Sequence, residues 1–181
     1  MVPNGWYWTN LGNVTNKIGS GVTPKGGSNS YKDSGIPLIR SQNVLWGTLA
    51  LNDVAYIDEL QHNKMKGSIV YKGDVLLNIT GASIGRTAIS HLEEANVNQH
   101  VCIIRSDKLD PNYLRDFLLS FSGQKQIEQF QAGGNRQGLN FEQIKSFKIP
   151  IPPLPEQRKI ATILGTWDKA ISTTERLIDN S

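Results

Sequence analysis

Arginine, asparagine, glutamine and lysine are gathered in four short polar segments of this 181-residue chain. The segments are Thr23–Lys32, Arg40–Asn43, Thr80–Thr87 and Ala132–Asn140. Arginine matches the acceptor edge of guanine and the amides match adenine, whereas lysine acts more often as a point charge toward phosphate. Glycines in three of the segments allow the backbone to approach a ligand closely. The recurrence of one chemistry in four places therefore favours a surface that contacts DNA.

This chemistry selects candidate contact residues. The base-reading candidates are Arg40, Gln42, Asn43, Arg86, Asn135, Arg136 and Gln137, and the phosphate candidates are Lys25 and Lys32. Arg136 has the strongest individual case, because its segment is flanked by glycines that leave the side chain room to project. The alternative for each is an ordinary polar loop, in which the arginine pairs with a carboxylate of its own domain.

The sequence shows no recognisable catalytic motif. Enzymes that methylate adenine usually hold the flipped base with an Asn-Pro-Pro-aromatic or Asp-Pro-Pro-aromatic tetrapeptide, and neither occurs here. The glycines at Gly81 and Gly85 follow an apolar run, but Arg86–Ile89 after them resembles a strand rather than the helix of a dinucleotide site. His62, His91 and His100 show no metal-ligand spacing. We expect no catalytic residue, metal site or cofactor in this chain.

Bulk composition is compatible with this interpretation. Residues 1–90 carry 8 Lys/Arg against 5 Asp/Glu and residues 91–181 carry 11 against 11, so the net charge of +3 arises entirely in the first half. A bias of this size is compatible with phosphate binding but does not establish it. The absence of a long apolar run and of a secretory leader predicts no membrane span and no export. A single cysteine, Cys102, suits the reducing cytoplasm.

The elements that must position these side chains differ along the chain. Residues 1–150 contain short branched apolar runs bounded by turn residues, which predict strands at 36–40, 54–57, 75–79 and 101–105. Helical spacing predicts a helix from Pro111 to about Phe130, and Asn140 with Gln143 resembles a capping pair at another helix start. Strands interrupted by segregated helices indicate an α+β domain with a mixed, mainly antiparallel sheet.

Residues 151–181 are expected to form a separate region that begins with a stiff proline connector. From Pro155 onward, apolar residues recur at spacings of 4, 3, 4, 3 and 4, which predicts a coiled-coil-like helix. Its seam consists of Ile160, Leu164, Trp167, Ile171, Thr174 and Ile178. Such a stripe packs either on its own domain or on another helix. Because the prolines direct the helix away from the preceding domain, we favour a partner helix.

The order of several motifs resembles the specificity subunits of type I restriction-modification systems. The motifs are Pro3–Trp6 with Leu11-Gly12, Gly21–Pro24, Ile36–Val44, Gly73–Leu76 leading into Thr80–Gly85, Asn98-Gln99, and the proline-rich run Ile149–Ala161 that contains Glu156-Gln157. The resemblance implies a target-recognition domain followed by a helical spacer. It also implies that this chain is half of the usual length, because members of that family carry two recognition domains and two long helices. The chain is then either a natural half-subunit that dimerises or a truncated piece.

The resemblance further implies a non-catalytic DNA-recognition subunit that reads one half of a bipartite target. Its implied partners are double-stranded DNA, modification (methyltransferase) subunits, a restriction subunit and a second copy or equivalent half. S-adenosylmethionine, ATP and magnesium would belong to those partners, which together form an adenine methyltransferase and ATP-dependent endonuclease. Two alternatives remain at the level of sequence. One is the recognition part of a DNA methyltransferase or restriction enzyme with its catalytic domain elsewhere, and the other is a module that binds proteins instead of DNA.

Overall fold

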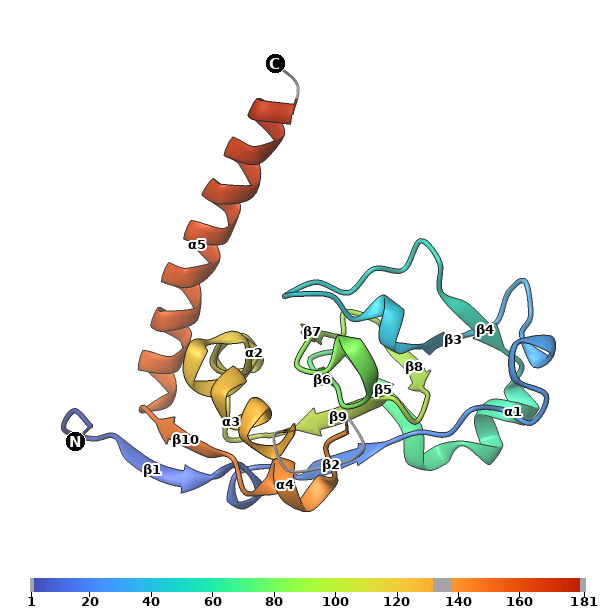
Figure 1. Cartoon of the computed structure of the whole chain (residues 1–181), viewed down its shortest axis with the longest axis horizontal. Coiled ribbons are helices and arrows are strands. Elements are labelled where there is room, and N and C mark those ends of the chain that lie inside the picture. The colour runs from blue at the N-terminus through green and yellow to red at the C-terminus, as the bar shows by residue number, and fades with distance from the viewer. Residues whose placement is uncertain (1, 132–137, 180–181) are drawn as a thin grey trace.

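The computed structural model describes residues 2–131 and 138–179. Two four-stranded sheets and a set of short helices form a body, and one long helix leaves it at the carboxyl end (Figure 1). This arrangement confirms the predicted α+β class with mainly antiparallel pairing, since β3 and β8 are the one parallel pair recorded among the described strands. Among the described residues, none of the helices combines the length and apolar character that a membrane crossing requires.

The first sheet is antiparallel in the order β2-β9-β6-β7. Its strands are β2 (Lys17–Ser20), β9 (Val101–Arg105), β6 (Val75–Asn78) and β7 (Thr87–Ile89). Alternate residues of the two central strands enter different cores: Leu77 and Cys102 face the helices, whereas Leu76 and Ile103 face the second sheet. Because both faces are buried, these strands appear in the sequence as continuous apolar runs.

The second sheet has the order β4-β3-β8-β5. Its strands are β4 (Ala55–Ile57), β3 (Ile36–Ile39), β8 (Glu94–Val97) and β5 (Ile69–Tyr71). An ion pair between the half-buried Arg105 and the buried Asp74 joins it to the first sheet. Arg105 of β9 donates to both carboxylate oxygens of Asp74 at 2.6 Å and to the carbonyl of Ile69 in β5 at 3.3 Å.

Helices cover the outer face of the first sheet. They are α2 (Pro111–Leu119), α3 (Phe121–Gln131) and α4 (Phe141–Lys145), while α1 (Glu59–Lys64) lies beside the second sheet. The capping pair of α4 is confirmed, because Asn140 and Gln143 bond each other's backbone amides at 2.9 Å. The single helix expected at 111–130 is wrong. Ser120 is extended and begins a second helix, whose Gly123 lies so close to Phe117 that a Cβ would meet its carbonyl at 2.3 Å.

The long helix α5 (Leu154–Asp179) begins just after a strand that pairs with the amino-terminal strand. Strand β10 (Lys148–Ile151) pairs antiparallel with β1 (Tyr7–Asn10) in a separate two-stranded ribbon, where Pro150 costs no central ladder bond. The proline-rich run is therefore extended, as predicted. Ile151 still belongs to this ribbon and is buried in the core, so the division after residue 150 stays a prediction.

Candidate nucleic-acid interface

Five loops meet at one end of the two sheets. In the antiparallel sheet, β2 and β6 end where β9 and β7 begin, and in the second sheet the parallel strands β3 and β8 end side by side. The connections after Ser20, Ile39, Asn78 and Val97 therefore share one edge of the body. The segment that begins at Gly138 joins them through a bridge to Thr80. We call this edge the loop end.

Side-chain hydrogen bonds tie the loops of the loop end together. The Thr23 hydroxyl donates to the Gln99 amide oxygen, and the Gln99 amide nitrogen lies 3.0 Å from Nε2 of His100. Nδ1 of His100 is 2.6 Å from the Thr80 hydroxyl. On the other side, the buried amide of Asn78 donates to the carbonyl of Ser41 at 2.8 Å. Three of the four polar segments found in the sequence are thereby brought into contact.

The second segment is held by its own loop. Arg40 donates to the carbonyl of Asp53 at 2.7 Å and lies 5.5 Å above the ring of Tyr31, while Gln42 donates to the Asp53 carboxylate at 2.5 Å. Asn43 is 2% exposed, and its amide accepts from the Arg40 backbone and donates to the carbonyls of Ala50 and Asp53. In this conformation Asn43 presents no edge to a ligand, because its polar atoms hold the loop together.

The remaining candidate contact residues differ in whether their charged groups already have a polar partner within the protein. Lys25 is exposed, and within the described residues neither its ammonium group nor the half-buried guanidinium of Arg86 has a recorded polar partner. Lys32 pairs with Asp58 at 3.6 Å across the surface. Asn135, Arg136 and Gln137 lie outside the described residues, although Gly138 beside them bridges to the Thr80 turn. All of these contacts remain proposals.

Sequence reasoning missed two parts of the loop end. One is the hydrogen-bond network of Thr23, Gln99, His100 and Thr80. Its members lie far apart in sequence, and no local motif groups them. The other is Trp46, which is 58% exposed at the tip of the hairpin between Val44 and Leu49. The sequence signal that could have revealed this exposed aromatic residue is a tryptophan followed by a glycine, Trp46-Gly47, inside a turn.

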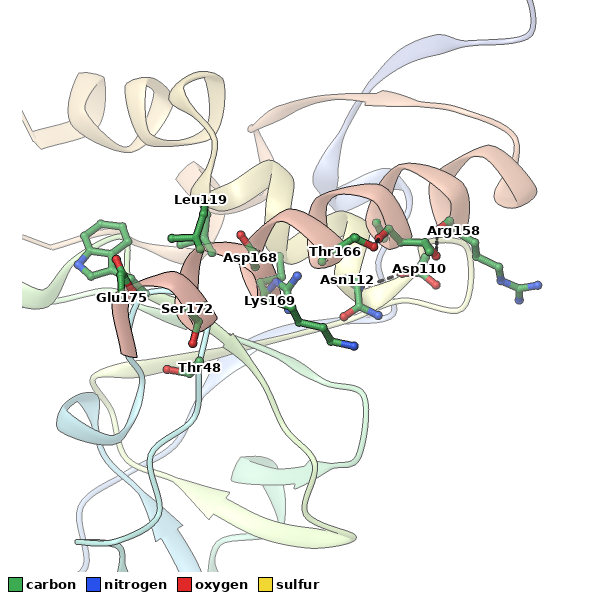
Figure 2. A pocket seen from close by; sticks show the side chains of 17 residues that line it. Thr48, Asp110, Asn112, Leu119, Arg158, Thr166, Asp168, Lys169, Ser172 and Glu175 are labelled. Atoms are coloured by element: carbon green, nitrogen blue, oxygen red, sulfur yellow. Dashed lines mark hydrogen bonds between the residues drawn. The ribbon is translucent and has the colours of Figure 1, made fainter. Parts of the chain in front are cut away.

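A groove separates this hairpin from the long helix (Figure 2). Its volume is about 970 Å³, and Thr48 faces Ser172 and Glu175 of α5 across it. The lining includes three cationic side chains, Arg115, Arg158 and Lys169, and three anionic ones, Asp110, Asp168 and Glu175. Because these charges balance, the groove has no clear preference for phosphate.

The thiol of Cys102 is buried in the core. Burial raises the pKa of the Cys102 thiol to about 12, so the thiolate that would act as a nucleophile does not form near neutral pH. Within residues 2–131 and 138–179 no three His, Cys, Asp or Glu side chains cluster as metal ligands would.

The model of the type I restriction modification DNA specificity domain matches residues 3–180 of this chain. The chain belongs to that family. It is 29% identical to the type I restriction enzyme EcoKI specificity subunit of Escherichia coli over 96% of its own length and 38% of the relative. It is 27% identical to the StySPI specificity subunit of Salmonella potsdam, over 98% of its length and 39% of the relative.

Solved structures agree in fold. The HsdS subunit from Thermoanaerobacter tengcongensis superposes with a TM-score of 0.73 at 23% identity, over 98% of this chain and 41% of that one. The S subunit from M. genitalium superposes with a TM-score of 0.67 at 14% identity, over 98% and 42%. This chain thus spans about two-fifths of the length of these relatives. The resemblance to type I specificity subunits, at roughly half their length, is confirmed.

Proposed function

We propose that this specificity domain binds double-stranded DNA through the loop end and reads one half of a bipartite target. The observation that carries the proposal is the convergence of polar loops from both sheets on a single edge. Arg40, Gln42 and Arg86 lie within this edge or border it. Loops on a rigid scaffold are where proteins place recognition residues, and guanidinium and amide groups supply direct readout of bases.

The long helix supports a second part of the proposal, which is pairing with another copy or an equivalent half. Beyond Ala161 the helix leaves the body (Figure 1), and Leu164, Trp167 and Ile171 are 42%, 65% and 54% exposed. Ile160 instead packs partly against the core at the helix base. Apolar residues in a single stripe at heptad spacing are stabilised by a facing helix.

The seam favours an antiparallel pair. Its spacings of 4, 3, 4, 3 and 4 read the same in both directions, so a two-fold axis near Lys169 sets every seam position opposite another. Ile163, Ala170 and Leu177 lie along one flank and would then face the same flank of the second copy, with Ile163 near Leu177. A parallel pair would instead set this apolar flank against Asp168 and Glu175 of the second copy. In the antiparallel arrangement the two recognition domains sit at opposite ends of the spacer.

The assembled complex would supply the chemistry. We infer that modification subunits and a restriction subunit dock on this scaffold and bring S-adenosylmethionine, ATP and magnesium with them. This chain would contribute recognition and spacing without a catalytic residue of its own.

Selection of bound sequences from random duplexes, with and without a modification subunit, tests the proposal. We expect the purified chain to enrich a defined sequence, to bind it more weakly as salt rises, and neither to methylate nor to cleave it with added cofactors. Methyl transfer or cleavage that copurifies with the chain would contradict the non-catalytic role. Binding to no duplex under any of these conditions would contradict DNA recognition and favour a protein-binding module.

A further inference from the structure

Trp46 is presented to solvent by a hairpin that backbone hydrogen bonds hold together. The amide of Leu45 donates to the carbonyl of Thr48 at 2.9 Å, and the amide of Ala50 donates to the carbonyl of Asn43 at 2.8 Å. Gly47 adopts a φ of +87°, a conformation that favours glycine and completes the turn. The indole nevertheless belongs to none of the three apolar cores and is 58% exposed. Core packing does not account for an exposed indole on an ordered turn.

The hairpin is attached to the loop end rather than standing apart from it. The amide of Gly47 donates to the carbonyl of Thr87 at 2.9 Å, directly beside Arg86. Trp46 also forms one wall of a hollow of about 350 Å³ whose other walls include Gly81, Ala82 and Ile84 of the β6–β7 turn. Nothing lies within 4 Å of the position that a Cβ on Gly81 would take, so this side of the hollow is open.

We infer that Trp46 is a DNA-contacting residue of the loop end, whose indole packs on a base or deoxyribose next to the position of Arg86. This inference rests on the proposed function and adds to it an apolar contact that the polar candidates lack. Tryptophan offers a large, rigid face with little side-chain entropy to lose. A preordered hairpin lowers the cost of binding further, because the loop is already in place.

Duplex DNA is favoured over a protein as the occupant. The turn that carries the indole is hydrogen-bonded to Thr87, the neighbour in sequence of Arg86, whose guanidinium has no recorded polar partner among the described residues. A cation near a flat apolar face suits phosphate next to base or sugar. The seam of the long helix is the better candidate for a protein contact, and apart from Ile171 its residues do not line the groove that faces the hairpin.

The test compares Trp46→Ala with Trp8→Ala in the full chain. Trp8 is a matched control, because it is 54% exposed but lies on β1, at the base of the long helix. The probe is the duplex recovered by selection with the unmodified chain, titrated at several salt concentrations. We expect Trp46→Ala to weaken this complex roughly tenfold, in the range of lost base stacking, with an unchanged slope of log affinity against log salt. Lys25→Ala should instead reduce that slope by about one.

The possible results distinguish the role of Trp46 from DNA recognition by the chain as a whole. If the unmodified chain binds a selected duplex and Trp46→Ala binds it equally well, the role of Trp46 is overturned while DNA recognition stands. If Trp46→Ala loses association with a modification subunit but keeps its DNA affinity, the hairpin is a protein contact and the inference is also overturned. Partial recovery by Trp46→Phe, with unchanged thermal melting, would support the aromatic contact. Failure of the unmodified chain to bind any duplex would remove the proposed function itself.

Discussion

Asp74 shows how a residue that marks the family serves the fold. Its carboxylate is 3% exposed, accepts two bonds from Arg105 and one from the Tyr71 amide, and so joins the two sheets. The Arg105 guanidinium also lies 4.8 Å above the ring of Tyr71. The hydrogen bonds to Asp74 raise the pKa of Arg105, which favours the charged form of the guanidinium.

We therefore expect Asp74→Asn to lower the free energy of unfolding by roughly 1.5–3 kcal/mol, the usual cost of losing bonds to a charged group. Urea denaturation followed by fluorescence would measure it. Glu93→Gln is the control: Glu93 pairs with Lys72 at 2.8 Å, but that pair is exposed and worth little. Equal losses in the two variants would show that the sheets are held together by apolar packing alone.

At this same scale, residue type alone selected the candidate contact residues, and their contacts with DNA stay a prediction. Residue type could not show which of these side chains are already bonded within the protein. Arg40, Gln42 and Asn43 were chosen because their groups match base edges. The structure shows that Asp53, ten residues beyond Asn43, bonds to all three. No local pattern predicts which polar loop will fold onto itself, because that depends on where the following hairpin returns. Arg86 and Lys25 are the described candidates without such a partner.

At the scale of the elements, contacts at the base of α5 join the first motif of the chain, Pro3–Trp6, to the last, Ile149–Ala161. The Gln157 side chain is 1% exposed, accepts from the Asp110 amide at 2.9 Å and donates to the carbonyl of Pro152 at 3.0 Å. The Trp6 indole donates to the Glu156 carboxylate at 2.8 Å. These contacts set the direction in which the helix leaves the body.

We predict that Gln157→Ala destabilises the chain by roughly 1–3 kcal/mol, because it leaves buried backbone groups of Asp110 and Pro152 without partners. Lys159→Ala, an exposed change two residues further along the helix, should stay within about 0.5 kcal/mol. Thermal unfolding monitored by circular dichroism would compare them. A Gln157 variant as stable as the Lys159 variant would mean that the proline run alone fixes the helix.

The elements that were predicted correctly are those with strong local signals. The strands β6 and β9 are buried on both faces, so their apolar runs in the sequence are continuous. The cap of α4 depends on only two residues, Asn140 and Gln143, which lie close together in sequence. The break at Ser120 was missed because the apolar spacing continues through it from Phe117 to Ile127. Strands β1 and β2 were missed because their residues are only partly buried and depend on distant partners, β10 and β9.

At the scale of the whole molecule, the proposed functions fall on two surfaces. The loop end lies on the body and the exposed seam lies on the helix, so on our proposal recognition and assembly would use different surfaces. An isologous pair of this chain, as we propose, would present two identical recognition domains in opposite orientations. Such a pair would read an inverted repeat whose two halves are separated by a gap that the spacer fixes.

The final prediction tests this arrangement by separating assembly from reading. Leu164→Asp combined with Ile171→Asp places two charges in the seam and should convert a dimer into a monomer in light scattering, because unpaired charges are costly to bury. Thr166→Asp with Thr173→Asp is the matched control, since it adds the same charge to exposed positions off the seam. Duplex selection should give an interrupted inverted repeat for the control and a single half-site, bound more weakly, for the seam variant. A monomeric unmodified chain that no equivalent half or modification subunit brings into a pair would contradict the role of the seam. An unchanged inverted repeat from the seam variant would show that some other surface joins the two recognition domains.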